Sequence, residues 1–390
     1  MLIEIHGAGF KNKGAELMLI ATMEKIRQDI PNAEFCINPS VYDDKPGCEK
    51  YGIYEFVKAP EPRGGRLFSP RFDLNKLLSV FFNKDKLKRK GYVRYQDVDA
   101  LVDVSGVRFG DKAPIISGHN FLKLAKYYRN RGKPVFLLPQ MFGPFDTELQ
   151  RKIVGELECL GVNFIARDNE SFKYLDKLVT NKLLISEAPD ITIALRGKSN
   201  NATLPTEDYG CIVPNVRMLD RGDDRWKIIY QSRLLMAAEE MLKVGITPSI
   251  ILHSVDGSED LPFAKEIESR LKDKCIIKHG DDPLELKEYI SKSKLLVGSR
   301  YHSIVSALSS GVPTVVMGWA HKYDTILDDF GVPHLIHRAN DTEKDYKILL
   351  DEVLKVESRN DLIKVISQRR DELSSKSDLM WKKVTNCFKE

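Results

Sequence analysis

Residues 295–322 read LLVGSRYHSIVSALSSGVPTVVMGWAHK, and the order of apolar runs and glycines in them indicates the fold class. An apolar run over 295–298 ends at a glycine, which is typical of a buried parallel strand. Apolar residues at helical spacing follow, and Gly311 and Pro313 predict the end of that helix. A second apolar run over 313–317 predicts another strand. The stretch is therefore predicted to form one strand–helix–strand unit of a parallel α/β sheet.

Polar residues of this unit fall where ligands of open α/β sheets bind. Ser299 is predicted to cap the helix, and Arg300 and His302 follow in its first turn, where backbone N–H groups and the helix dipole favour an anion. His321 and Lys322 follow the next strand at the same carboxyl edge. The alternative is that Arg300 and His302 are ordinary surface residues. We favour an anion site, because a cation in a first turn opposes the dipole unless it binds a ligand.

Length and composition indicate a two-domain globular protein. The chain has 390 residues, 42% of them hydrophobic and 30% charged, and its net charge of +4 is too small to indicate a nucleic-acid partner. Six cysteines without metal-ligand spacing favour reduced thiols in a reducing compartment. The sequence also lacks the features of a signal peptide and any run of about 18 apolar residues. A cytoplasmic protein, at most associated with the inner face of a membrane, is expected.

The first residues predict the start of a Rossmann-like half. A strand over 2–6 and a glycine-bearing loop lead to a helix over 14–29, although the loop matches neither GxGxxG nor a Walker sequence. Asn12 and Lys13 fall where the loop enters the helix. They either face a ligand or, in the case of Asn12, only cap the helix, and the sequence does not decide between the two.

More polar residues follow predicted strands of the first half. Asp103 lies in the apolar run DALVDV at 99–104, where an ionised group needs a compensating role. We therefore favour a site acid over a simple turn residue. Arg108, Gln140 and Arg167 also come at or just after predicted strand ends, so we expect them near a ligand cleft.

A polar stretch without apolar periodicity, residues 197–206, is predicted to separate domains 1–200 and 201–390. The second half repeats the alternation of strands and helices, and Arg217 falls just past its first strand. A helical tail over 360–390 could cross back to the N-terminal domain. The expected fold is α/β, with two facing Rossmann-like domains and the site in the cleft between them.

Residues 66–94 join apolar positions at helical spacing to the basic run KDKLKRK. One interpretation is a core-packed helix with a solvated basic tail. The other is a flap that makes peripheral contact with a membrane surface or a lipid-linked acceptor. We favour the first, because basic amphipathic segments are common and the sequence has no other membrane feature.

The order of these motifs resembles the polysaccharide pyruvyl transferase family, whose fold is that of two-domain glycosyltransferases of the GT-B type. The resemblance extends over nearly the whole chain, and its most specific part is the RxH block at Arg300. Ala15 stands where the family often has aspartate, and Ser105 where it often has a glycine. The matching segments are NKGAE, DALVDVSG, PVFLLPQMFGPF, ARDNESFKYL, APD, and GSRYHSIVSALSSGVP with the later HK.

The resemblance implies transfer of a pyruvyl group from phosphoenolpyruvate to two hydroxyls of one sugar, in the synthesis of an exopolysaccharide or other cell-surface glycan. The product is a cyclic ketal, and phosphate is released. The donor is a small anion with a phosphate and a carboxylate, which suit charge-assisted contacts in the C-terminal domain. The residues expected at the donor are Arg300, Arg217, Lys322, Ser299 and His321.

The same resemblance implies roles in catalysis. His302 is expected to be the general acid, and Asp103 to activate an acceptor hydroxyl as base. The acceptor is expected on the N-terminal domain, either free or lipid-linked, near Asn12, Lys13 and the strand-end residues named above. No metal or other cofactor is expected, because arginines and a helix dipole can stabilise the charge.

Two other functions are compatible with this fold. A glycosyltransferase that uses a sugar nucleotide is the main alternative, although Gly311–Val312–Pro313 stands where an acidic residue would hold ribose hydroxyls. A non-catalytic saccharide-binding protein is the second alternative. The presence of both Arg300 and His302 argues against it.

Overall fold

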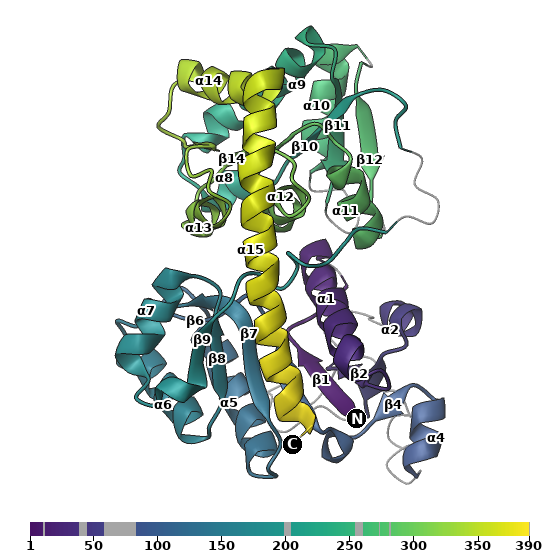
Figure 1. The fold of residues 1–390 in the computed structure, drawn as a ribbon, viewed down its shortest axis with the longest axis vertical. Helices are drawn as coiled ribbons and strands as arrows, with labels where there is room; N and C mark the ends of the chain where they lie inside the picture. Colours follow the sequence, from purple (N-terminus) through teal and green to yellow (C-terminus); the bar gives the residue numbers. More distant parts are fainter. Residues whose placement is uncertain are drawn as a thin grey trace. The chain divides into compact units, whose positions relative to one another are not determined.

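The computed structural model describes residues 1–10, 12–38, 45–57, 83–198, 204–253, 260–272, 274–280 and 282–389. These residues form two compact units, each built on a parallel sheet (Figure 1). The first unit comprises Met1–Phe10, Met18–Ile191 and Lys376–Glu390, and the second comprises Lys11–Leu17 and Thr192–Ser375. The predicted fold class, α/β with parallel sheets in two domains, is confirmed.

The sheet of the first unit has the strand order β4-β3-β2-β1-β5-β7-β8-β9, with β6 beside β7. Its described strand pairs are all parallel. The order runs outward from β1 and β5, so the topological switch point lies between these two strands. The strands are β1 (Leu2–His6), β2 (Glu34–Ile37), β3 (Tyr54–Phe56), β4 (Tyr92–Val93), β5 (Ala100–Asp103), β6 (Val107–Phe109), β7 (Val135–Phe142), β8 (Asn163–Ala166) and β9 (Ile185–Glu187).

Helices connect these strands. α5 packs against β5, β6 and β7 and against α6, while α7 packs against β7, β8 and β9. The end of the last helix also joins this unit, where Thr385 donates to Asp29 at 2.6 Å. The helices are α1 (Lys13–Asp29), α2 (Lys45–Tyr51), α4 (Lys84–Arg89), α5 (Ile115–Arg129), α6 (Glu148–Cys159) and α7 (Asn169–Leu178).

The sheet of the second unit has the order β12-β11-β10-β13-β14-β15, with parallel pairing throughout. This is the 3-2-1-4-5-6 order of the Rossmann fold, and its switch point lies between β10 and β13. Helices on both faces explain why strands such as β10 are buried and apolar. The strands are β10 (Tyr209–Val213), β11 (Thr247–Leu252), β12 (Ile276–His279), β13 (Leu296–Gly298), β14 (Thr314–Met317) and β15 (Ile336–His337).

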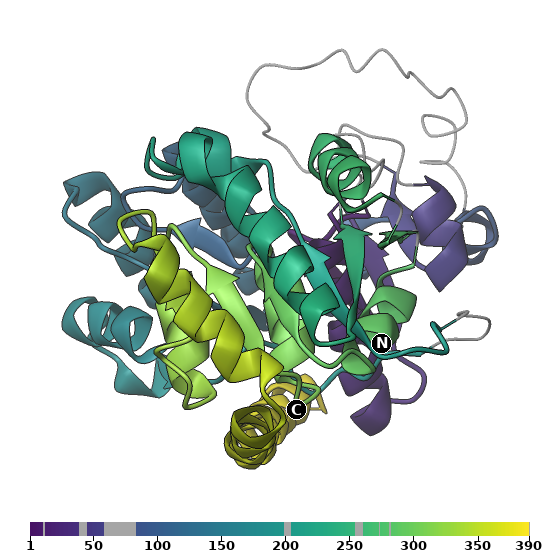
Figure 2. The same ribbon diagram turned by 90° about the horizontal axis from the view of Figure 1, so that it is seen from above.

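The helices of the second unit pack on this sheet. α9 contacts β10 and β11 and lies beside α14 (Figure 2). α12 contacts β13 and β14, so the quoted stretch forms the strand–helix–strand unit that was predicted. The helices are α8 (Arg217–Arg221), α9 (Trp226–Lys243), α10 (Leu261–Leu271), α11 (Pro283–Ser291), α12 (Tyr301–Leu308), α13 (Lys322–Asp329), α14 (Glu343–Leu354) and α15 (Val356–Lys389).

The structure describes the predicted helical tail and the basic part of the segment 66–94. The tail is a single helix, α15, which packs with the second unit as far as Ser375 and with the first from Lys376. The apolar part of 66–94 lies outside the described residues, whereas its basic run forms α4, capped by Asn83. Within the described part of the chain, no helix is both long and apolar enough to cross a bilayer.

Candidate functional site

The switch point of the second unit is built around Arg300, which directly follows β13 and is the N-cap of α12. Its Nε donates to the carbonyl oxygen of Pro214 at 3.2 Å, and its Nη2 donates to the buried carboxylate of Asp260. The other oxygen of Asp260 accepts from the backbone N–H of Val216 at 3.0 Å. Among the described residues Nη1 has no hydrogen-bond partner. The guanidinium is thus fixed on one side and can bind an anion on the other.

Ser299 has a different place from the one predicted. The helix begins at Tyr301 with Arg300 as its N-cap, so the prediction that Ser299 caps it is wrong. Ser299 is fully buried, and its hydroxyl forms a hydrogen bond with that of Tyr230. Its carbonyl accepts from Tyr323 at 2.8 Å and from Asn215 at 3.0 Å. The side chain turns into the core because Tyr230 offers it a partner there.

The start of α1 packs against His302, which lies in the first turn of α12. A Cβ atom added to Gly14 would fall 2.0 Å from Nδ1 of His302. Next to it, Lys13 is buried and forms an ion pair with Glu16 at 3.0 Å. The side chain of Asn12 accepts from the Gly14 N–H at 2.9 Å, so it caps α1. The NKGAE segment therefore belongs to the same site as His302.

His253, which the sequence analysis did not select, also belongs to this site. It follows β11 and is buried. Burial lowers its pKa to about 3, and the charges of Arg300 and His302, and more weakly of Lys13, act in the same direction. The imidazole is therefore neutral at physiological pH. Its position directly after the apolar run at 250–252 was the signal that could have identified it.

The remaining residues predicted at the donor lie on two helix starts. The Nζ atom of Lys322 lies 5.1 Å from the ring centroid of Tyr323 and 5.5 Å from that of Tyr301, within cation–π range. His321 is the N-cap of α13 and is exposed, and the helix begins at Lys322. Arg217 begins α8 and forms an exposed ion pair with Asp220 at 2.7 Å.

A second cluster lies at the switch point of the first unit, around Asp103 at the end of β5. The carboxylate is fully buried and accepts from Ser105 at 2.7 Å, from Nη2 of Arg108 at 2.8 Å and from Gln140 at 3.0 Å. Burial alone would raise the pKa of Asp103, but the positive charges of Arg108 and His6, with these hydrogen bonds, lower it below its usual value. The structure thus brings together three residues predicted separately.

Two neighbours complete this cluster. Gly7 has a φ of +79°, and a Cβ atom there would fall 2.1 Å from Oγ of Ser105, so only glycine lets the two strand ends approach so closely. The backbone of Arg167 donates to the carbonyl of Gln140 at 3.0 Å. Its side chain instead lies 3.5 Å from the carboxylate of Asp190.

His6 and Glu4 were missed by the sequence analysis. His6 ends β1 and is in register with Asp103 on β5. Its Nδ1 lies 3.2 Å from Oε1 of Glu4, which is fully buried. The argument that selected Asp103, an ionisable group within an apolar strand, also applies to Glu4 in LIEIH.

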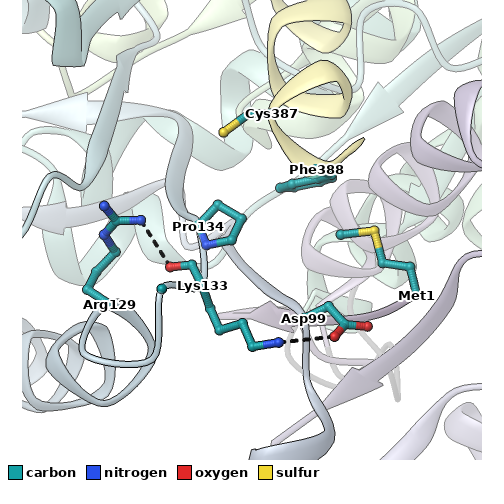
Figure 3. A pocket seen from close by; sticks show the side chains of 8 residues that line it. Met1, Asp99, Arg129, Lys133, Pro134, Cys387 and Phe388 are labelled. Atoms are coloured by element: carbon teal, nitrogen blue, oxygen red, sulfur yellow. Dashed lines mark hydrogen bonds and ion pairs between the residues drawn. The ribbon is translucent and has the colours of Figure 1, made fainter. Parts of the chain in front are cut away.

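A cavity of about 510 Å³ opens at the opposite, amino edge of the first sheet (Figure 3). Its cations have partners: Lys133 pairs with Asp99 at 3.2 Å, and Arg129 donates to the carbonyl of Lys133 at 3.1 Å. Ligands of parallel sheets bind at the carboxyl edge, so we do not place the site here. Among the described residues, no group of three or more His, Cys, Asp or Glu is arranged to hold a metal ion.

The sequence was compared with models of protein families and with curated proteins. A family model described as polysaccharide pyruvyl transferase matches residues 12–321. None of the curated proteins matches the sequence.

Solved structures share the fold. UDP-GlcNAc 2-epimerase from Methanocaldococcus jannaschii is 12% identical over 91% of this chain and 93% of its own, with a TM-score of 0.57. The glycosyltransferase SnogD from Streptomyces nogalater is 15% identical over 98% of this chain and 99% of its own, with a TM-score of 0.51. UDP-GlcNAc 2-epimerase from Neisseria meningitidis, bound to UDP-GlcNAc, is 12% identical over 96% and 98%, with a TM-score of 0.53. At these identities the likeness shows the GT-B fold alone.

Proposed function

This chain belongs to the polysaccharide pyruvyl transferase family, and on that premise we propose that it transfers a pyruvyl group from phosphoenolpyruvate to two hydroxyls of a sugar. The sugar is part of a cell-surface polysaccharide or its precursor. The observation that carries the proposal is the start of α12, where the braced guanidinium of Arg300 and the imidazole of His302 follow one strand of the switch point.

Phosphoenolpyruvate is proposed to bind at this helix start. The free face of Arg300 and the ammonium of Lys322 suit its phosphate and carboxylate, and each charge-assisted contact contributes about 1.5–3 kcal/mol. Arg217 and His321, which begin or cap the helices after β10 and β14, stay proposed further contacts. Ser299 is proposed to act indirectly, because its buried hydroxyl and carbonyl fix the start of the helix. No cofactor is invoked.

The proposed reaction begins at the methylene carbon of phosphoenolpyruvate. His302, as imidazolium, donates a proton to the methylene carbon, and positive charge develops at C2. One sugar hydroxyl loses its proton and forms an O–C2 bond. The second hydroxyl then forms another O–C2 bond as the bond from C2 to the phosphate oxygen breaks, and its proton leaves with the phosphate. The products are a cyclic ketal with a new methyl group and inorganic phosphate.

The acceptor is proposed to bind the cluster of the first unit, where Arg108 and Gln140 surround Asp103. Arg108 also donates to Ser117 at 2.8 Å, so its guanidinium is held in place and can orient sugar hydroxyls. Gln140 contributes an amide to the same group, and its Oε1 has no hydrogen-bond partner among the described residues. Such an unused acceptor suits a hydroxyl donor. Whether the sugar is free or lipid-linked is an outcome of the assay below.

A glycosyltransferase activity with a sugar nucleotide is the second candidate. The observation that favours it is the strand order of the second unit, since nucleotides bind at the switch point of such sheets.

One assay separates the two candidates. Phosphate release from phosphoenolpyruvate is measured with and without galactosides, glucosides and N-acetylmannosaminides, each free and lipid-linked, and the sugars are analysed by mass spectrometry. Acceptor-dependent release with a pyruvyl mass gain on the sugar supports the pyruvyl transferase. No release, together with thermal stabilisation by UDP or GDP, would replace it with the glycosyltransferase.

A further inference from the structure

Glu4 and His6 of β1 and Tyr128 of α5 form a hydrogen-bonded relay that none of the roles above uses. Glu4 lies in the middle of the first sheet, between β2 and β5, and is fully buried. A carboxylate in such a place is unfavourable unless both oxygens are hydrogen-bonded. Here Oε2 accepts from the hydroxyl of Tyr128 at 2.6 Å, and Oε1 lies 3.2 Å from Nδ1 of His6.

Protonation in the relay follows from its chemistry. Burial, with the negative charge of Glu4, raises the pKa of Tyr128 far above its usual value, so Tyr128 donates and Glu4 accepts. An ionised carboxylate can only accept hydrogen bonds, so Nδ1 of His6 must carry the proton that it shares with Glu4. The second nitrogen, Nε2, then holds a free electron pair. This arrangement, in which a buried carboxylate fixes the tautomer of a histidine, is the one that general bases use.

The location of the relay indicates a role at the substrate. His6 is the last residue of β1 and is paired in register with Asp103, so it lies at the switch point of the first sheet. Its side chain is 15% exposed, whereas Glu4 and Tyr128 are fully buried, so only the imidazole end of the relay reaches solvent. The ring also packs against Phe121, whose other contacts include the guanidinium of Arg108.

Asp103 is less suited to remove a proton. It is fully buried, and both of its oxygens already accept from Arg108, Ser105 or Gln140. Burial would raise its pKa, but the charges of Arg108 and His6 lower it below the ordinary value, which makes a weak base. Its negative charge beside His6 would instead stabilise an imidazolium.

We propose that His6 is the catalytic base that takes the proton from the attacking acceptor hydroxyl, and that Glu4 and Tyr128 are the residues that position it. The inference rests on the proposed function. The hydroxyl proton moves to Nε2 of His6 as the O–C2 bond forms, and the imidazolium is stabilised by Glu4 at Nδ1 and by Asp103 alongside. His6 returns the proton to solvent after the ketal is released. His302 takes up a proton from solvent in place of the one that it donated.

The test uses the sugar acceptor that supports phosphate release by the wild-type chain. His6→Ala is expected to lower kcat by about 100-fold or more with unchanged affinity for phosphoenolpyruvate, measured by calorimetry. Added imidazole is expected to restore part of the lost rate, which a purely structural role would not allow. The matched control is His334→Ala, which breaks an exposed His–Glu hydrogen bond of 2.9 Å in the second unit, and it should have the wild-type rate.

A second measurement does not depend on turnover. Long-range proton–nitrogen NMR correlations of labelled histidine should show His6 protonated on Nδ1, and Glu4→Gln should change this tautomer and lower kcat. A wild-type His6 protonated on Nε2 would overturn the inference, as would a folded His6→Ala variant with the wild-type rate or one that imidazole fails to rescue. If instead the wild-type chain releases no phosphate with any acceptor, the proposed function has failed rather than the assignment of the base within it.

Discussion

Gly14 leaves room for the imidazole of His302: a Cβ atom at position 14 would lie 2.0 Å from Nδ1 and 2.7 Å from Cγ of that ring. No real Cβ atom is found so close to another heavy atom, so the ring of His302 depends on a glycine far away in the sequence. The Asn12 side chain holds this glycine by its N–H, which fixes the start of α1 against the histidine. The first loop thus acts on the proposed acid through its backbone.

Gly14→Ala is expected to lower kcat by about 100-fold with little change in the affinity for phosphoenolpyruvate. The methyl group must displace the ring of His302, and a catalytic group misplaced by about 1 Å costs roughly that factor. Steady-state kinetics and calorimetry with phosphoenolpyruvate measure the two quantities. The control is Gly155→Ala in α6, where an added Cβ meets no atom within 4 Å, so wild-type kinetics are expected. A Gly14→Ala enzyme with normal kcat would contradict the proposed role of His302.

Arg300→Lys is expected to weaken phosphoenolpyruvate binding by about 10- to 100-fold. The lysine keeps the charge beside Asp260 but loses the planar fork, and one charge-assisted contact is worth about 1.5–3 kcal/mol. Calorimetric titration gives the affinity. Arg270→Lys is the control, because Arg270 forms an exposed pair with Glu266 on α10. An unchanged affinity in Arg300→Lys would move the donor away from the start of α12.

The strand-end argument explains how much of both clusters could be predicted from the sequence. Parallel strands bring their carboxyl ends to one edge, so Asp103, Arg108 and Gln140 could be expected together before any contact was known. The same argument applies to His6, which ends β1, and to His253, which follows β11. Neither was selected, because no other charged residue beside them in the sequence indicated a site. His6 stands out as a site residue only once its buried partner Glu4 is known.

Other features depend on tertiary contacts that a local pattern does not contain. β7 contains Pro139 and still continues to Phe142, because the register with β8 shifts between Leu137 and Gln140 and accommodates the proline. Ser299 has the sequence position of a helix cap, but the hydroxyl of Tyr230 provides a buried partner instead. The contact of Gly14 with His302 likewise joins segments from opposite ends of the chain.

Stability is expected to fall in acid through His337. This residue is fully buried between the rings of Trp226 and Tyr346, and neither ring nitrogen has a hydrogen-bond partner among the described residues. Burial lowers its pKa to about 4, and the charge of Arg233 also lowers it, although Asp341 opposes both. Between about pH 6.5 and pH 4, His337 is protonated in the unfolded chain but not in the folded chain. The unfolding free energy therefore decreases by up to about 1.4 kcal/mol for each pH unit of acidification in this range.

His337→Phe removes this linkage and keeps an aromatic ring of similar size. Urea denaturation at pH 7.5, 6 and 5 gives the unfolding free energy as a function of pH. This free energy should fall less steeply in the variant, and the difference in slope should correspond to at most one proton. Equal slopes for His337→Phe and the wild-type chain would show that folding does not lower the pKa of His337.

The ion pair of Asp103 and Arg108 is expected to be strongly coupled. Arg108→Met leaves a fully buried carboxylate without its counter-charge, which typically costs about 3–5 kcal/mol of unfolding free energy. In Asp103→Asn/Arg108→Met neither charge of this pair remains, so the double variant should be more stable than the sum of the single effects by about 1–3 kcal/mol. Urea denaturation of the four proteins at neutral pH closes the cycle. The exposed pair of Lys126 and Glu156, at 2.6 Å, gives the reference cycle, for which a coupling of at most about 1 kcal/mol is expected. Additive effects at Asp103 and Arg108 would mean that Ser105 and Gln140 alone stabilise the carboxylate. The effect of Asp103 on the imidazolium of His6 would then have to be measured in the Arg108→Met variant.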